Sequence, residues 1–177
     1  VSGSVVFNRG TFQLDSVMPV MSGVNGQLDF SDTGIRSQGV KATALGGALA
    51  ISGGLGGDNK NLVIAGEASS QAIARFAGLS NDVGLEGRAA YRVAVERTPA
   101  GRYDIALTSN LKGMRIDLPS PLGKFADESK ELEARWAPLG QGRAQLQVRI
   151  GSDIRMDMRR DLAVKGAYFN RAVMALN

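Results

Sequence analysis

The fold is decided by residues 88–108, which read RAAYRVAVERTPAGRYDIALT. Apolar and polar side chains alternate along 88–97 and again along 102–108, so each stretch has one apolar and one polar face. The intervening Thr-Pro-Ala-Gly, residues 98–101, is typical of a turn. The stretch therefore predicts an antiparallel hairpin whose apolar face carries Val93, Val95, Ile105 and Leu107.

The same alternation recurs on both sides of this hairpin. Residues 24–30, 144–150 and 154–159 repeat it, and shorter apolar runs at 62–68 and 132–136 indicate further strands. Residues 40–45 and 47–52 favour two strands over one helix, because Gly46 and Gly47 would cost a helix about 2 kcal/mol. We also expect strands at 5–7, 11–14 and 167–176, with a turn at 8–10.

Helices are expected to be few and short. Ser69 or Ser70 precedes residues 71–77, whose apolar side chains have helical spacing, and residues 123–129 predict a further helical turn. The sequence thus predicts a mainly β protein with one or two short helices. No linker interrupts the pattern, so we expect a single β-rich module over residues 1–177 that is a fragment of a longer protein.

Composition excludes several kinds of chemistry. The chain has no Cys and no His, so it holds no thiolate site, no Ser-His-Asp mechanism and no imidazole ligand for a metal. The net charge of +4 is scattered and forms no basic stripe, which argues against a nucleic-acid partner. The acidic residues occur singly at turns or on polar strand faces. We therefore predict no catalytic residues, no metal and no cofactor.

The apolar strand residues have two interpretations. They can form a closed protein core, or they can be an adaptable surface that accepts hydrophobic ligands, for which methionine is well suited. Alternation alone does not show whether protein or lipid covers the apolar face of each strand. Beyond the hairpin, the candidates for facing a lipid are Leu146, Val148, Ile154 and Met156.

A more particular stretch follows the hairpin. Residues 109–113 read SNLKG, and residues 116–124 read IDLPSPLGK. Gly113 permits a bulge, and the prolines end a strand because they lack an N–H donor. For Lys124, an exposed surface position is favoured over contact with a lipid phosphate.

These two motifs resemble the YhdP family, the large AsmA-like envelope proteins of Gram-negative bacteria, in their central region of unknown function. Residues 24–30 and Thr33-Gly34-Ile35 resemble a second sequence motif of the family. Asn110 occupies a position at which Asp is commoner in the family. The family-motif residues, to which we assign a structural role, are Asn110, Leu111, Gly113, Leu118, Pro119, Pro121, Leu122 and Lys124.

The resemblance implies a strongly bent antiparallel sheet of the repeating β-groove type. It implies a periplasmic segment of a protein anchored in the inner membrane by a helix outside this fragment. The concave apolar face would shield phospholipid acyl chains in transit to the outer membrane, and the sheet edges would pair with adjoining β units of the same parent chain. The envelope proteins that it contacts are unknown.

Two other functions stay open. A structural or scaffolding module would bind protein partners through its sheet edges and keep its apolar face as a core. A carbohydrate-binding sandwich is weakened by the scarcity of aromatic residues, since Trp136 is the only tryptophan.

Overall fold

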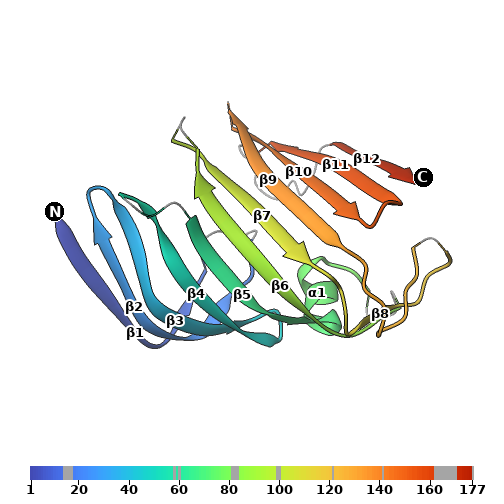
Figure 1. The fold of residues 1–177 in the computed structure, drawn as a ribbon, viewed down its shortest axis with the longest axis horizontal. Helices are drawn as coiled ribbons and strands as arrows, with labels where there is room; N and C mark the ends of the chain where they lie inside the picture. Colours follow the sequence, from blue (N-terminus) through green and yellow to red (C-terminus); the bar gives the residue numbers. More distant parts are fainter. Residues whose placement is uncertain are drawn as a thin grey trace.

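The computed structural model describes residues 1–13, 18–57, 59, 61–80, 84–98, 101–120, 122–140, 142–161 and 171–176. These residues form one open antiparallel sheet in which almost every strand lies beside the next strand of the chain (Figure 1). β8 alone leaves this order and pairs with β6. The strands are β1 Ser2–Phe12, β2 Met21–Ser31, β3 Gly34–Ala44, β4 Gly47–Gly56, β5 Asn61–Ser69, β6 Leu85–Arg97, β7 Tyr103–Ser109, β8 Met114–Ile116, β9 Leu132–Gly140, β10 Arg143–Ile150, β11 Ile154–Asp161 and β12 Arg171–Leu176.

The mainly β architecture with an open, bent sheet confirms the predicted fold class. The hairpin at residues 88–108 is β6–β7, and residues 40–52 form β3 and β4 instead of a helix. The last predicted strand is β12, and its expected start at 167–170 lies outside the described residues.

The described part of the chain contains one helix, α1 (Ser70–Phe76). Its N-cap is Ser69, whose side chain accepts a hydrogen bond from the Ala72 N–H. The helical turn predicted at 123–129 is wrong. That segment contains turns and an isolated bridge from Lys124 to Ile116, which pairs Lys124 with the end of β8. No described helix has the length and apolar content needed to cross a bilayer.

The N-terminal end departs from expectation. Two short strands separated by a turn are predicted at 5–14, but the chain forms one long strand, β1, with register shifts around Gly10. Arg9 adopts a φ of 54°, and its N–H is held by the Asn25 side chain at 3.1 Å. The irregularity at Arg9 is therefore a bulge in a continuous strand, because the residues on both sides of it pair with β2.

Bulges recur across the neighbouring strands and bend the sheet. The pairing of β2 with β3 shifts around Asn25, and the pairing of β3 with β4 shifts between Arg36 and Val40. In the second bulge the Ser37 hydroxyl donates to the Ile51 carbonyl at 2.7 Å and accepts the Val40 N–H. Bulges that lie side by side bend several strands together. Figure 1 shows the resulting curvature along β1–β4.

Gly26 lies where these bulges meet. Its φ is +124°, and a Cβ there would lie 2.8 Å from the Val40 Cα. The obstacle is backbone, so a rotamer change on a neighbour cannot relieve it. The bend therefore requires glycine at this position.

We predict that Gly26→Ala lowers the free energy of unfolding by about 2 kcal/mol or more, because it combines strain at φ with a backbone clash. Urea denaturation followed by circular dichroism measures the change. Gly10→Ala is the matched control, since its Cβ would meet only the Phe7 ring at 3.8 Å, and it should stay within about 0.5 kcal/mol of the wild type. Equal effects of the two substitutions would contradict this role for Gly26.

Candidate functional site

The strand register places the eight predicted lipid-facing residues on one side of the sheet. Val93 is opposite Leu107, and Val95 is opposite Ile105. Trp136 of β9 is opposite both Ile105 and Leu146, which joins the β6–β7 hairpin to β10. Directly opposite residues share a face. We define the apolar face by the residues of β6–β11 on this side: Tyr91, Val93, Val95, Ile105, Leu107, Leu132, Ala134, Trp136, Leu146, Val148, Ile150, Ile154, Met156 and Met158.

Most of the apolar face is only half-buried. Val93, Ile105, Leu146 and Met156 all retain contact with solvent, although they lie in the middle of a wide sheet. Among the described elements, only α1 contacts the sheet from outside it, through β5 and β6. Two residues on this side are exceptions: Ile154 has 5% of its surface exposed, and Ala144, which shares the face of Leu146, has 0%. Over β7, β9, β10 and β11 the apolar face has no second layer of described structure.

One end of the apolar face is covered. Ile73 of α1 packs with Leu111 and Met114 against Ala89, and Leu132 and Ile150 contact the same cluster. The helix and the segment after β7 therefore close the lower end of the face in Figure 1, where α1 lies behind the sheet. At the opposite strand ends the described residues include no helix, but Ala144 of β10 is fully buried there.

In the N-terminal strands the apolar side of the sheet is a buried hydrophobic cluster. Ile64 continues the Val93 row onto β5, and Ile51 continues it onto β4. There the side chains pack against one another in a buried cluster. The members of this packed half are Met21, Val24, Val40, Ala42, Ala44, Leu49 and Ile51, with Phe7, Leu28, Leu62 and Ile64 against them. The apolar side of the sheet thus has a packed half and a half-exposed half.

Sequence reasoning missed several members of this side. Leu132, Ala134 and Trp136 alternate with Glu133 and Arg135, so periodicity could have placed them on the apolar face. Ile64 could not have been found in this way. Its neighbour Val63 is buried on the opposite face while Ile64 is half-buried, so β5 shows no apolar and polar alternation.

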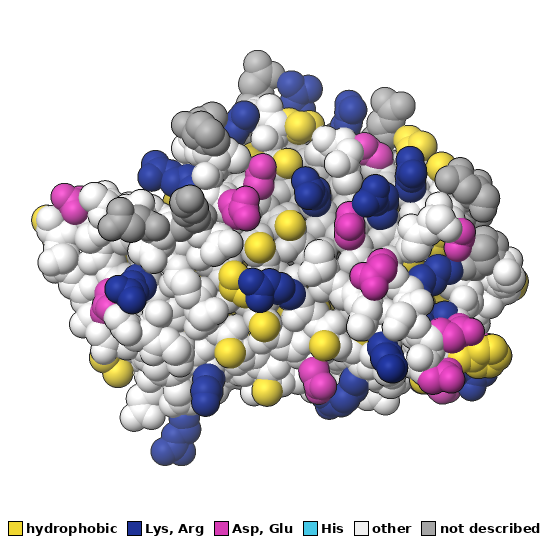
Figure 2. All heavy atoms as spheres, in the orientation of Figure 1, with side chains coloured by type: hydrophobic (Ala, Val, Ile, Leu, Met, Phe, Trp, Pro, Cys, Tyr) yellow, Lys and Arg dark blue, Asp and Glu magenta, His cyan; other side chains and the backbone are white. Residues whose placement is uncertain are grey.

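The other side of the sheet is polar. Figure 2 shows it facing the viewer, with basic and acidic side chains interspersed among small hydrophobic ones. Arg149 Nη2 lies 2.7 Å from Glu133 Oε2, and Gln145 donates to Asp157 at 2.6 Å. This mixture is typical of a hydrated surface.

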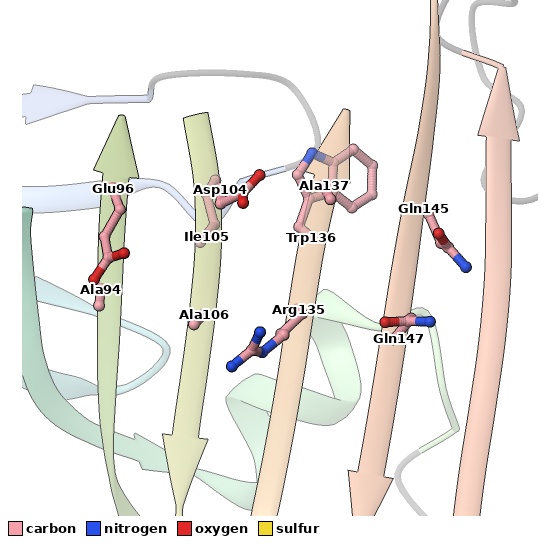
Figure 3. A pocket seen from close by; sticks show the side chains of 10 residues that line it. All are labelled: Ala94, Glu96, Asp104, Ile105, Ala106, Arg135, Trp136, Ala137, Gln145 and Gln147. Carbon is pink, nitrogen blue, oxygen red and sulfur yellow. The ribbon is translucent and has the colours of Figure 1, made fainter. Parts of the chain in front are cut away.

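A hollow on the polar face is floored by alanines and rimmed by charged and amide side chains (Figure 3). Glu96 and Asp104 are directly opposite each other, and Arg135 lies on the strand beyond. A rim of this composition is unsuited to an acyl chain. The hydrophobic site is therefore the apolar face and not this hollow. The rim of the hollow is formed by Glu96, Asp104, Arg135, Gln145 and Gln147.

The family-motif stretch forms the corner that covers one end of the apolar face. The Ser109 hydroxyl donates to the Ala90 carbonyl at 2.7 Å and accepts the Leu111 N–H at 3.0 Å. The Asn110 side chain accepts the Lys112 N–H, which forms a tight turn. Leu111 is buried at a φ of 53°, so this turn drives an apolar side chain into the cluster beneath α1.

The remaining motif residues continue this corner. Gly113 has a φ of +92°, and a Cβ would lie 2.5 Å from the Arg88 carbonyl oxygen. Pro119 accepts hydrogen bonds from the Leu122 and Gly123 N–H groups, which closes a turn after β8. Leu118 is exposed at 46%, and Pro121 lies outside the described residues.

Lys124 is buried, so its predicted exposed position is wrong. Its Nζ donates to the carbonyl oxygens of Leu111 at 2.9 Å, Phe125 at 2.7 Å and Met114. Three acceptors match the three donors of an ammonium group. Burial lowers the pKa of Lys124, while the Glu128 and Asp127 carboxylates oppose this shift. Lys124 therefore fastens the corner and is not available to a ligand.

Within the described ranges, no group of three or more Asp, Glu, His or Cys side chains is arranged to hold an ion.

Lys124→Met should lower the free energy of unfolding by about 3 kcal/mol, because it leaves buried carbonyl groups without a donor. Thermal and urea unfolding measure this loss. Lys112→Met, an exposed neighbour in the same stretch, should change it by less than about 0.5 kcal/mol. A Lys124 variant as stable as the Lys112 variant would show that the three hydrogen bonds contribute nothing.

Comparison with known proteins identifies the relatives of this sheet. No curated protein and no solved structure matches the chain. The family model described as YhdP protein matches residues 1–177, the whole chain. The sequence motifs and the bent sheet agree with that match. The chain belongs to the YhdP family.

Proposed function

We propose that the chain is a non-enzymatic segment of an AsmA-like envelope lipid transporter. Its apolar face would shield phospholipid acyl chains in transit to the outer membrane. The observation that carries this proposal is the half-exposed apolar face, most of which, beyond the end that α1 and the corner cover, has no second layer of described structure. Membership of the YhdP family fits an envelope protein, and we propose a periplasmic position with an inner-membrane anchor elsewhere in the parent protein.

The physical chemistry of the face suits this role. Burying apolar surface is favourable by about 25 cal/mol per Å², so an acyl chain laid on these side chains would be stabilised out of water. The methionines on β11, Met156 and Met158, can adapt to chains of different shape. The polar face keeps the outer side of the sheet hydrated.

A structural module is the second candidate, and the sheet edges favour it. β1 and β12 end the strand order, so each has one side without a partner strand among the described residues. An unpaired edge offers N–H and C=O groups to another strand. Under either function, we expect adjoining β units of the parent chain to pair there.

Photo-crosslinking in the full-length protein tests lipid contact directly. A benzophenone side chain at Val93 or Ile105 should form adducts with phospholipid in cells. The adjacent positions Ala94 and Ala106 face the polar side of the same two strands, so the same group there should give few adducts. Lipid adducts at all four positions, or at none of them, would refute the proposal.

Substitution by aspartate separates an open face from a closed core. Val93→Asp should destabilise by only about 1 kcal/mol, because the new carboxylate can stay hydrated, while transport is lost. Val40→Asp is the control, since Val40 is 1% exposed in the packed half, and it should cost about 4 kcal/mol or more. Urea denaturation gives both values. If Val93→Asp were as destabilising as Val40→Asp, the apolar face would be a core.

A further inference from the structure

Methionine is the only sulfur-containing side chain of this protein, which has six methionines and no cysteine. The methionine side chains that the structure describes differ in their access to solvent. Met21 and Met114 are buried, with 8% and 3% of their surface exposed. Met156 and Met158 are half-buried and belong to the apolar face, and Met18 is half-buried in the loop between β1 and β2. An oxidant in solution can therefore reach the methionines of the apolar face more readily than the buried ones.

We propose that Met156 and Met158 form a reversible oxidation site, at which hypochlorous acid produces methionine sulfoxide and so weakens lipid binding to the apolar face. This inference rests on the proposed lipid-carrying function and adds its regulation. The thioether sulfur gains the oxygen atom of the acid and is oxidised by two electrons, while chlorine is reduced to chloride and a proton is released. A methionine sulfoxide reductase reverses the change, with a dithiol as the source of two electrons and two protons and with water as the product.

The register places both methionines among apolar neighbours. Met156 is directly opposite Val148, and Met158 is directly opposite Leu146. On its other side, Leu146 is opposite Trp136. A sulfoxide oxygen is a polar acceptor, and an acyl chain laid over it offers no hydrogen-bond donor in return. Oxidation would thus place two unpaired polar groups in adjacent rows of the apolar face.

The same oxidation should leave the fold intact. Met21 belongs to the packed half and Met114 to the cluster under α1, and both are shielded from the oxidant by burial. The oxygen atoms added at Met156 and Met158 can stay hydrated in the absence of lipid, because no second layer of described structure lies over β11. The oxidant therefore modifies the surface that contacts lipid and spares the clusters that stabilise the sheet.

The test uses the full-length protein with a benzophenone side chain at Ile105, treated with hypochlorous acid and then incubated with vesicles of phosphatidylethanolamine and phosphatidylglycerol. Peptide mass spectrometry locates the sulfoxides, and the number of lipid adducts after illumination measures binding. We expect sulfoxide at Met156 and Met158 before Met21 and Met114, and a loss of adducts by about fivefold or more. The circular dichroism spectrum should not change, and methionine sulfoxide reductase with dithiothreitol should restore the adducts.

Two variants assign the loss to particular methionines. Met156→Leu combined with Met158→Leu keeps an apolar face of similar volume without its thioethers, so oxidation should reduce its adducts by less than about twofold. Met18→Leu removes the half-buried methionine outside the apolar face, and its adducts should fall as in the wild type.

Three results would overturn the oxidation site and leave the lipid-carrying function standing. They are an equal loss of adducts in the wild type and the double variant, no loss in the wild type with sulfoxide at both positions, and oxidation of Met21 and Met114 before Met156 and Met158. A complete lack of adducts in every untreated protein would overturn the proposed function, and the oxidation site with it.

Discussion

Register is the constraint on which this structure depends. Side chains alternate between the two faces of a strand, so a slip of one residue would move every apolar side chain of that strand to the polar face. From β5 to β12 the pairing runs with a single shift, between Arg143 and Ala144. This continuity lets Ile64, Val93 and Leu107 fall into one row although they belong to three strands. The continuity of the apolar face therefore depends on the strand register as well as on which residues are apolar.

Bending divides that face into two environments. In β1–β4, bulges and the positive φ of Gly26 turn the apolar side chains toward one another, and Val40 becomes almost fully buried. The packed half can stabilise the sheet without help from a second layer. The half-exposed half keeps apolar surface in contact with solvent, which is costly for a protein with no other use for it. Stability and proposed function therefore occupy different parts of one sheet.

Much of this arrangement could be predicted from the sequence. Regular alternation specified the hairpin of Val93 and Ile105 and the faces of β10 and β11, because a half-buried strand has a period of two. The bulge at Arg9 could not be predicted, since Asn-Arg-Gly has turn chemistry and only its pairing with β2 makes it part of a strand. The burial of Lys124 could not be predicted from the sequence either. Its three acceptors belong to Leu111, Met114 and Phe125, and only the closed corner brings them together.

The nearest-neighbour strand order has a geometric consequence. Adjacent strands are spaced by about 4.8 Å, so each added antiparallel hairpin lengthens the sheet by roughly 10 Å and leaves its cross-section unchanged. Length along the sheet and width across it are therefore specified separately, the first by the number of strands and the second by the number of residues in each. The distance that such a sheet spans is therefore set by its number of hairpins.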